Sequence, residues 1–199
     1  MYNNPNFNVI ILSPGRTGST LISHFFSKVT KFTPYTRQHL DNNLPMRPKQ
    51  VLHSHTISDI NLGNENTLYI ISKRNMVESA FSSLIGRQTN KWEYYKNQSV
   101  RISNFEVSKE DFLSFYQAIN NFYKNLSNVI PKHCQVIDYS EFNNNFENLF
   151  DIFNINKTYY KFVDKNIIPI KTPGTYSDWI INYDELYSFS QNLDPNPPI

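Results

Sequence analysis

Residues 8–29 decide the fold of this chain, and they read NVIILSPGRTGSTLISHFFSKV. Residues 9–12 form an unbroken apolar run, which is typical of a parallel strand buried on both faces. The sequence SPG ends this run, and apolar residues then recur at helical spacing over residues 21–29. The pattern predicts a strand, a tight loop and a helix, with Ser19 or Thr20 as the helix N-cap.

The loop between this strand and helix is suited to bind an anion. Such a loop directs backbone N–H groups and the positive end of a helix toward one point. Gly15 and Gly18 allow close approach, Arg16 adds a positive charge, and Ser19 and Thr20 add hydroxyl donors. We expect a phosphate-like ligand here; the alternative is an ordinary strand-to-helix turn.

The composition indicates one folded domain that spans residues 1–199, because 39% of the residues are hydrophobic and 15% are aromatic. A net charge of +2 is too small to indicate a surface for nucleic acid. The terminal residues 1–7 and the Pro-rich residues 194–199 are expected to be loose tails.

Other features of the whole chain concern its compartment. Cys134 is the single cysteine, which excludes an intramolecular disulfide. No apolar run approaches the ~20 residues that a membrane span needs, and the N-terminus has no charged and apolar regions typical of a secretory signal. We therefore expect a soluble cytoplasmic protein with no membrane partner, and the sequence leaves room for a homo-oligomer.

The loop order PGRTGSTL resembles the 5′-phosphosulfate loop of sulfotransferases that use 3′-phosphoadenosine-5′-phosphosulfate (PAPS), whose usual form is P-[KR]-[ST]-G-[ST]-[ST]. The ATP-binding loop needs G-x-x-x-x-G-K-[ST], and here Ser19 stands where that loop has its Lys. The resemblance implies that the 5′-phosphosulfate is bound by Gly15, Arg16, Thr17, Gly18, Ser19 and Thr20, with Arg16 neutralising charge on the leaving group.

A second match follows the strand predicted over residues 66–72. There RNMVESAFS resembles the family's R-[ND]-P-x-[DE]-x-x-x-S, which implies that Arg74 and Ser82 hold the 3′-phosphate of PAPS. The helix after this strand is predicted to begin after an Asn N-cap and to end near Gly86. The alternative for Arg74 is a surface ion pair with Glu78 at i, i+4.

The strand predicted over residues 50–55 ends in two histidines. Strand alternation puts His53 and His55 on the same side, at the sheet edge where ligands bind in open α/β folds. The ending HSH resembles the family's K-T-H, which implies that His55 deprotonates the acceptor. The alternatives are a structural histidine and a metal pair, for which the sequence offers no convincing third ligand nearby.

Two later segments complete the resemblance. A strand over residues 134–139 is followed by a stretch like the family's Y-E-D and helix, which implies that Tyr139 contacts the adenine. The segment from Ile170 to Trp179 resembles R-K-G-x-x-G-D-W, which implies nucleotide contacts for Lys171 and Gly174. In an ATPase interpretation, Asp138 would instead bind magnesium.

Two segments carry weaker signals. Residues 31–49 contain three prolines and are predicted to form a loop with at most a short helix, in which Tyr35, Arg37 and His39 can face an acceptor. Residues 87–107 have no clear period and are expected to cover the acceptor cleft, although an ordinary surface segment fits equally.

Together these patterns predict a three-layer α/β fold like that of P-loop NTPases, with a central parallel sheet flanked by helices. The resemblance to PAPS-dependent sulfotransferases implies transfer of a sulfuryl group from PAPS to a hydroxyl or amine of a small-molecule or glycan acceptor, with release of the bisphosphate PAP and without a metal. The alternatives are a nucleoside or nucleotide kinase that uses ATP and magnesium, and a non-catalytic nucleotide-binding module.

Overall fold

The computed structural model describes residues 7–30, 32–35, 46, 49–57, 60, 66–95, 98, 100–130, 134–142, 145–164, 166, 168–170 and 172–199. A five-stranded sheet, in which every pair of neighbouring strands is parallel, forms its centre. The strands lie in the order β2-β3-β1-β4-β6. They are β1 (Asn8–Leu12), β2 (Thr33–Tyr35), β3 (Gln50–Ser54), β4 (Thr67–Lys73) and β6 (Cys134–Asp138).

Alternate residues of β1 supply the two faces of this sheet. Ile10 and Leu12 belong to one hydrophobic cluster, and Val9 and Ile11 belong to the other. This division follows from strand geometry, because successive side chains point to opposite faces. The predicted three-layer α/β fold is therefore confirmed.

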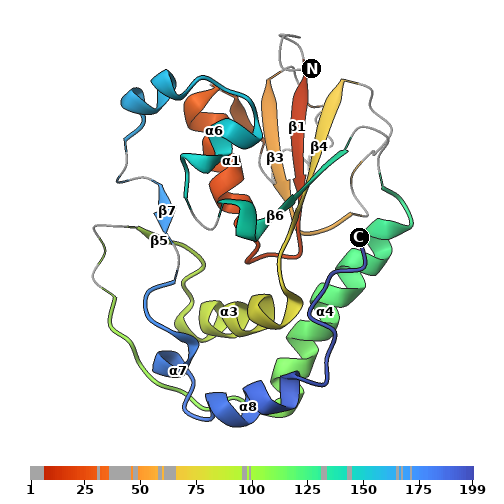
Figure 1. Ribbon diagram of the computed structural model, residues 1–199, viewed down its shortest axis with the longest axis vertical. Helices are drawn as coiled ribbons and strands as arrows, with labels where there is room; N and C mark the ends of the chain where they lie inside the picture. The colour runs from red at the N-terminus through yellow and green to blue at the C-terminus, as the bar shows by residue number, and fades with distance from the viewer. Residues whose placement is uncertain are drawn as a thin grey trace.

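Helices cover both faces of the sheet, as Figure 1 shows for α1 and α6 on one side and α3 and α4 on the other. The first group comprises α1 (Ser19–Val29), α5 (Tyr139–Phe142) and α6 (Asn148–Ile152). The second comprises α3 (Met76–Thr89), α4 (Lys109–Ser127), α7 (Tyr176–Trp179) and α8 (Tyr183–Ser190). A 3-10 helix, η1 (Lys157–Phe162), and the antiparallel pair β5 (Tyr94–Tyr95) and β7 (Pro169–Ile170) complete the described elements.

The edge strand β2 corrects the prediction of a loop over residues 31–49. It pairs in parallel with β3, and Pro34 lies within it. A proline is tolerated at a sheet edge because no neighbour needs its missing N–H. A three-residue strand is too short to leave a period in the sequence. Arg37 and His39 lie outside the described residues.

The end of α3 also differs from the prediction. The helix continues past Gly86 to Thr89, and Asn90 ends it in the left-handed conformation. A Cβ atom at Gly86 would lie 2.8 Å from the Trp92 ring. Gly86 is therefore suited to close packing against Trp92 and does not end the helix.

The described residues of the two segments that were expected to be loose, Phe7 and residues 194–199, make contacts with the domain. The side chain of Phe7 is buried in the core cluster that includes α1. At the other end, the Tyr116 hydroxyl donates to the Asp194 carbonyl at 2.9 Å. Ile199 packs against the hydrophobic cluster that includes α3 and α4. Residues 1–6 lie outside the described part. None of the described helices combines the length and apolar character that crossing a membrane requires.

Candidate functional site

The loop between β1 and α1 turns through three residues in the left-handed region, Gly15 (φ 98°), Arg16 (φ 58°) and Gly18 (φ 76°). Neither Ser19 nor Thr20 caps α1, because Gly18 takes the N-cap position. The Ser19 hydroxyl instead accepts a hydrogen bond from Ser13 Oγ at 2.8 Å. The expected order of strand, tight loop and helix is therefore present, with Gly18 as the N-cap in place of Ser19 or Thr20.

Contacts with β4 and α5 hold this loop in place. The Ser72 hydroxyl donates to the Thr17 carbonyl at 2.6 Å, and a Cβ at Gly18 would lie 2.5 Å from the Phe142 ring. The Thr17 side chain is fully buried, and its hydroxyl has no partner among the described residues. Thr17 is absent from the described walls of the neighbouring cavity, so any contact of Thr17 with a ligand stays a prediction.

A cavity of about 890 Å³ opens beside this loop, where β1, β3 and β4 end. Most of the residues that the sequence assigned to ligand binding line it. Those residues are Gly15, Arg16, Gly18, Ser19, Thr20, His55, Arg74, Ser82, Tyr139 and Gly174. The tertiary structure thus brings together the matches that lie far apart in the sequence. Lys171 lies outside the described residues.

Arg74 is buried in the wall of this cavity, with 6% of its surface exposed. Its guanidinium donates to Glu78 Oε2 from Nε and from one terminal nitrogen, at 3.1 and 2.9 Å. The same terminal nitrogen donates to the Tyr176 hydroxyl at 2.9 Å, and the group lies 4.3 Å above the Tyr139 ring. The ion pair with Glu78 therefore exists, with Arg74 buried and Glu78 exposed.

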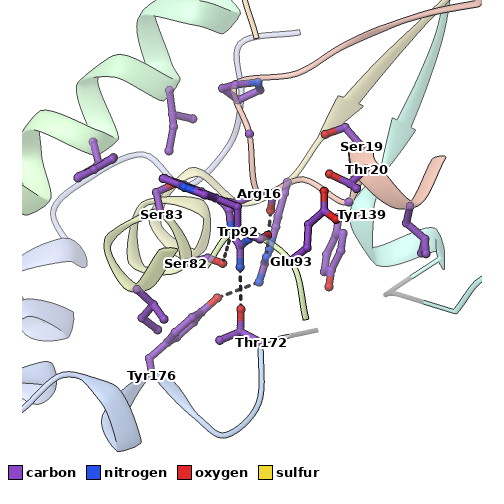
Figure 2. Close-up of a pocket in the computed structure, with 18 of the residues that line it drawn as sticks. Arg16, Ser19, Thr20, Ser82, Ser83, Trp92, Glu93, Tyr139, Thr172 and Tyr176 are labelled. Carbon is purple, nitrogen blue, oxygen red and sulfur yellow. Dashed lines mark hydrogen bonds between the residues drawn. The ribbon is translucent and has the colours of Figure 1, made fainter. Parts of the chain in front are cut away.

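Arg16 extends from the loop toward α3, as Figure 2 shows. Its Nε donates to Ser82 Oγ at 2.9 Å, and one terminal nitrogen donates to Thr172 Oγ1 at 2.7 Å. The other terminal nitrogen donates to the Trp92 carbonyl. Burial, and next the charge of Arg74, lower the pKa of Arg16. Two guanidinium groups and the Ser82 hydroxyl therefore gather at one end of the cavity.

His55 lies at the mouth of the cavity, and its Nδ1 is 2.9 Å from the Ser13 carbonyl. A carbonyl oxygen only accepts, so this contact requires the hydrogen on Nδ1. In the neutral ring, Nε2 is then the atom with a lone pair, and it can accept a proton. The geometry therefore suits His55 to act as a base.

His53 lies beside His55, with ring centroids 4.5 Å apart, which confirms that the two histidines share one side of the strand. Burial lowers the pKa of His53 to about 3, so the ring is neutral near pH 7. Its Nε2 is buried and has no partner among the described residues. Within the described residues, no group of three or more side chains of the metal-ligating types is placed to hold a metal.

The sequence did not reveal several contacts in the cavity. Thr172 and Tyr176 bind the two arginines, and the Trp92 carbonyl and Glu93 belong to a segment without periodicity. The signals in the sequence were less specific: the segment from Ile170 to Trp179 resembled a nucleotide-contacting segment, and residues 87–107 were expected to cover the acceptor cleft, which agrees with the presence of Trp92 and Glu93 in the cavity wall. Asp178 completes a capping box with Thr175 and so shapes the start of α7.

Asp138, the residue that an ATPase interpretation would assign to magnesium, makes its described side-chain contacts within its own segment. Its Oδ1 accepts hydrogen bonds from the Ser140 N–H at 2.9 Å and from the Ser140 hydroxyl at 2.7 Å. It is also absent from the described walls of the cavity. These contacts give Asp138 a local role at the start of α5.

No protein-family model matches the sequence, and no protein of curated function matches it. The solved structures include two similar chains. A sulfotransferase from Alicyclobacillus acidocaldarius is 13% identical, with a TM-score of 0.47 over 92% of this chain and 90% of that chain. The sulfotransferase domain of the Synechococcus PCC 7002 olefin synthase is 12% identical, with a TM-score of 0.44 over 96% of each chain. Similarity at this level does not decide function.

Proposed function

We propose that the chain is a sulfotransferase that moves a sulfuryl group from PAPS to a hydroxyl or amine of a small-molecule or glycan acceptor and releases PAP. The observation that carries this proposal is the gathering of Arg16, Arg74 and Ser82 beside the anion-binding loop. A nucleotide with a second phosphate needs two anion sites, and an arginine pair supplies charge-assisted hydrogen bonds for the second one.

The loop itself holds the 5′-phosphosulfate in this proposal. Backbone N–H groups near Gly15 and Gly18 and the hydroxyls of Ser19 and Thr20 surround the place where the loop meets the cavity. The close approach of Phe142 and Tyr139 to Gly18 leaves no room for a side chain there. PAPS supplies the sulfuryl group and a leaving phosphate, and fixed donors stabilise charge as it develops on that phosphate.

His55 removes the proton from the acceptor. Its Nδ1 is held by the Ser13 carbonyl, which directs the basic nitrogen Nε2 away from the loop backbone. The acceptor oxygen or nitrogen attacks sulfur, the bond between sulfur and the bridging oxygen breaks, and the proton moves to Nε2. A positioned base of this kind contributes typically ~10²–10⁴-fold to the rate. His53 also lines the cavity, but burial lowers its pKa to about 3, which makes it the weaker base in this proposal.

Two measurements test the proposal. Turnover of labelled PAPS with a panel of hydroxyl and amine acceptors should give labelled product and PAP, whereas binding without turnover would identify a nucleotide-binding module. The midpoint temperature of thermal unfolding should rise with PAP and rise much less with ATP and magnesium. A ligand that binds only the native state stabilises that state. A larger shift with ATP, together with magnesium-dependent ATP consumption, would replace the proposal with a kinase.

A further inference from the structure

One wall of the cavity is an apolar face of α4. The residues of this helix that line the cavity are Phe115, Ala118, Ile119 and Phe122. Their spacing of three and four positions places them on one face of the helix, and none has a polar side-chain group. Figure 2 shows α4, in green, across the view from Ser19 and Thr20 of the loop. This wall therefore lies apart from the residues that the proposed function assigns to the phosphosulfate.

The core does not fully cover this face of α4. The residues through which the helix is buried in the core are Phe112, Tyr116, Ile119, Tyr123 and Leu126. Phe115 and Phe122 are only partly buried, and Ala118 is exposed. Apolar surface that remains open to a cavity favours binding of a ligand that removes it from water.

Trp92 adds an aromatic ring to this apolar lining. It lines the same cavity, and 50% of its surface is exposed. The ring packs against Gly86 of α3, the helix that lies beside α4. The Trp92 carbonyl accepts from the Arg16 guanidinium, so the residue is held both by α3 and by the loop.

Most polar side chains of the described wall belong to other parts of the cavity. They come from the loop, from the arginine pair and its partners, and from residues 172–183 around Tyr176, which binds Arg74. The others, apart from the Trp92 indole, are His53, His55, Ser83 and Glu93.

Ser83 and Glu93 already have partners. The Ser83 hydroxyl donates to the Ser79 carbonyl at 2.8 Å, so its hydrogen is not free for a ligand. The Glu93 carboxylate accepts from the Tyr95 hydroxyl, and its charge opposes the lowering of the pKa of His24 by burial. A glycan has a hydroxyl group on most of its carbons, and a buried hydroxyl without a partner costs free energy. The described wall therefore suits an apolar molecule better than a glycan.

We propose that the acceptor is an alcohol or amine with an apolar body, which lies against the α4 wall while its hydroxyl or amino group meets His55. This inference rests on the proposed function and narrows its acceptor class. His55 lines the same cavity, and Ile57, two residues further, packs against the hydrophobic cluster that includes α3 and α4. The volume of about 890 Å³ is near the upper end of the ~300–1,000 Å³ of ligand pockets, which leaves room for an acceptor beside the nucleotide.

A series of 1-alkanols from butanol to decanol tests this acceptor class, with methyl glucoside as the sugar for comparison. Initial rates with labelled PAPS give kcat/KM for each acceptor. In the wild type, kcat/KM should rise about three- to fourfold for each added methylene until the apolar wall is covered, the effect of burying one such group. An equal kcat/KM for all alkanols would overturn this inference, and turnover of any acceptor would then leave the proposed function intact. No turnover with any acceptor, although PAP binds, would overturn the proposed function and the inference with it.

A charge placed in the α4 wall tests where the apolar body lies. Ala118→Glu should lower kcat/KM for octanol about tenfold or more, because a carboxylate there loses water when the alkyl chain binds. Calorimetric titration should show unchanged affinity for PAP, since the residues assigned to the nucleotide do not include α4. Gln117→Glu is the matched control, because Gln117 is the exposed neighbour in α4 and is absent from the described cavity walls. It should leave both quantities unchanged.

Equal kcat/KM for octanol in the two variants would contradict the assignment of the apolar body to the α4 wall. A matching loss of PAP affinity in Ala118→Glu would also contradict it, since the wall would then serve the nucleotide. Should Ala118→Glu fail to fold by circular dichroism, the alkanol series with the wild-type protein decides.

Discussion

The backbone N–H of Met76 donates to the carbonyl of Pro195, 2.8 Å away, and so ties the end of the chain to the first turn of α3. The sulfotransferase pattern that this segment resembles has a proline at the position of Met76. Proline has no N–H, so the substitution in this chain creates a contact that the family pattern would not allow. The exchange therefore has a tertiary consequence, because it allows a hydrogen bond between the start of α3 and the C-terminal segment.

Met76→Pro should therefore release the C-terminal segment. The lost hydrogen bond is worth about 0.5–1.5 kcal/mol. Because the Met76 side chain is also buried, Met76→Ala is the matched control, since it removes the side chain and keeps the N–H. A carboxypeptidase should remove residues 194–199 faster from the Pro variant than from the Ala variant. Equal rates would show that other contacts hold the segment.

Arg74→Ala should weaken PAP binding by about one to two decades and leave AMP binding nearly unchanged. One charged hydrogen bond to a 3′-phosphate is worth roughly 1.5–3 kcal/mol, and AMP lacks that phosphate. Calorimetry with both nucleotides measures the difference. Equal losses would mean that the contacts of Arg74 with Glu78, Tyr176 and the Arg16 carbonyl serve the fold alone.

His55→Ala should lose most of the transfer activity, about 10²-fold or more, while it keeps PAP binding, because the lost group acts on the acceptor. His53→Ala should be milder, since the His53 ring is neutral and its Nε2 is buried. Initial rates with labelled PAPS and PAP titrations of both variants provide the comparison. A larger loss of transfer activity in His53→Ala than in His55→Ala would mean that His53, and not His55, is the base.

His53 also makes stability depend on pH. Its pKa of about 3 in the folded chain lies below the unfolded value of about 6.5, so the unfolded chain binds the proton more readily. The free energy of unfolding should therefore fall as pH is lowered from about 6.5 toward 3, and this group should contribute no slope above that range. Between pH 7 and pH 5 the contribution is about 2 kcal/mol. Urea unfolding at both pH values measures the free energy of unfolding of the wild type and of His53→Phe. Between pH 7 and pH 5 this free energy should fall less in the variant, and an equal fall in the two proteins would contradict the prediction.

Gly18→Ala should disrupt the anion-binding loop. A Cβ at this position would lie 2.5 Å from the Phe142 ring, and a φ of 76° is unfavourable for alanine. We expect a loss of about 1–3 kcal/mol in stability and weaker binding of PAP and AMP alike, because in the proposed function the loop binds the 5′ group that both share. Near-wild-type unfolding and binding would show that the loop does not need this backbone conformation.

The elements that surround the site could be predicted because their signals are local. The apolar run of β1 and the helical spacing of α1 are contained in residues 8–29. Asn75 caps α3 by accepting from the Glu78 N–H, and Ser108 caps α4 in the same way through Asp111, as their places in the sequence indicate. Such contacts join residues a few positions apart, so the order of residue types in a short segment is enough to predict them.

The short strands β2, β5 and β7 could not be predicted in this way. Each has two or three residues, and each is defined by hydrogen bonds to a partner elsewhere in the chain. A segment of that length has no measurable period, and its partner cannot be read from its own residues. The same limit applies to Gly86, whose position near the end of a helical pattern suggested a stop although its neighbour is the Trp92 ring.

The sequence by itself determined the layered α/β fold, the glycine-containing loop between β1 and α1 and the residue types that surround it, because burial patterns and loop conformation depend on neighbours in the chain. Only the tertiary structure decided the direction of the Arg16 side chain and the binding of Arg74 by Tyr176. A long flexible side chain takes the direction set by whichever acceptors the fold brings near it. For Arg16 those acceptors are Ser82, Trp92 and Thr172, which follow it by 66, 76 and 156 residues.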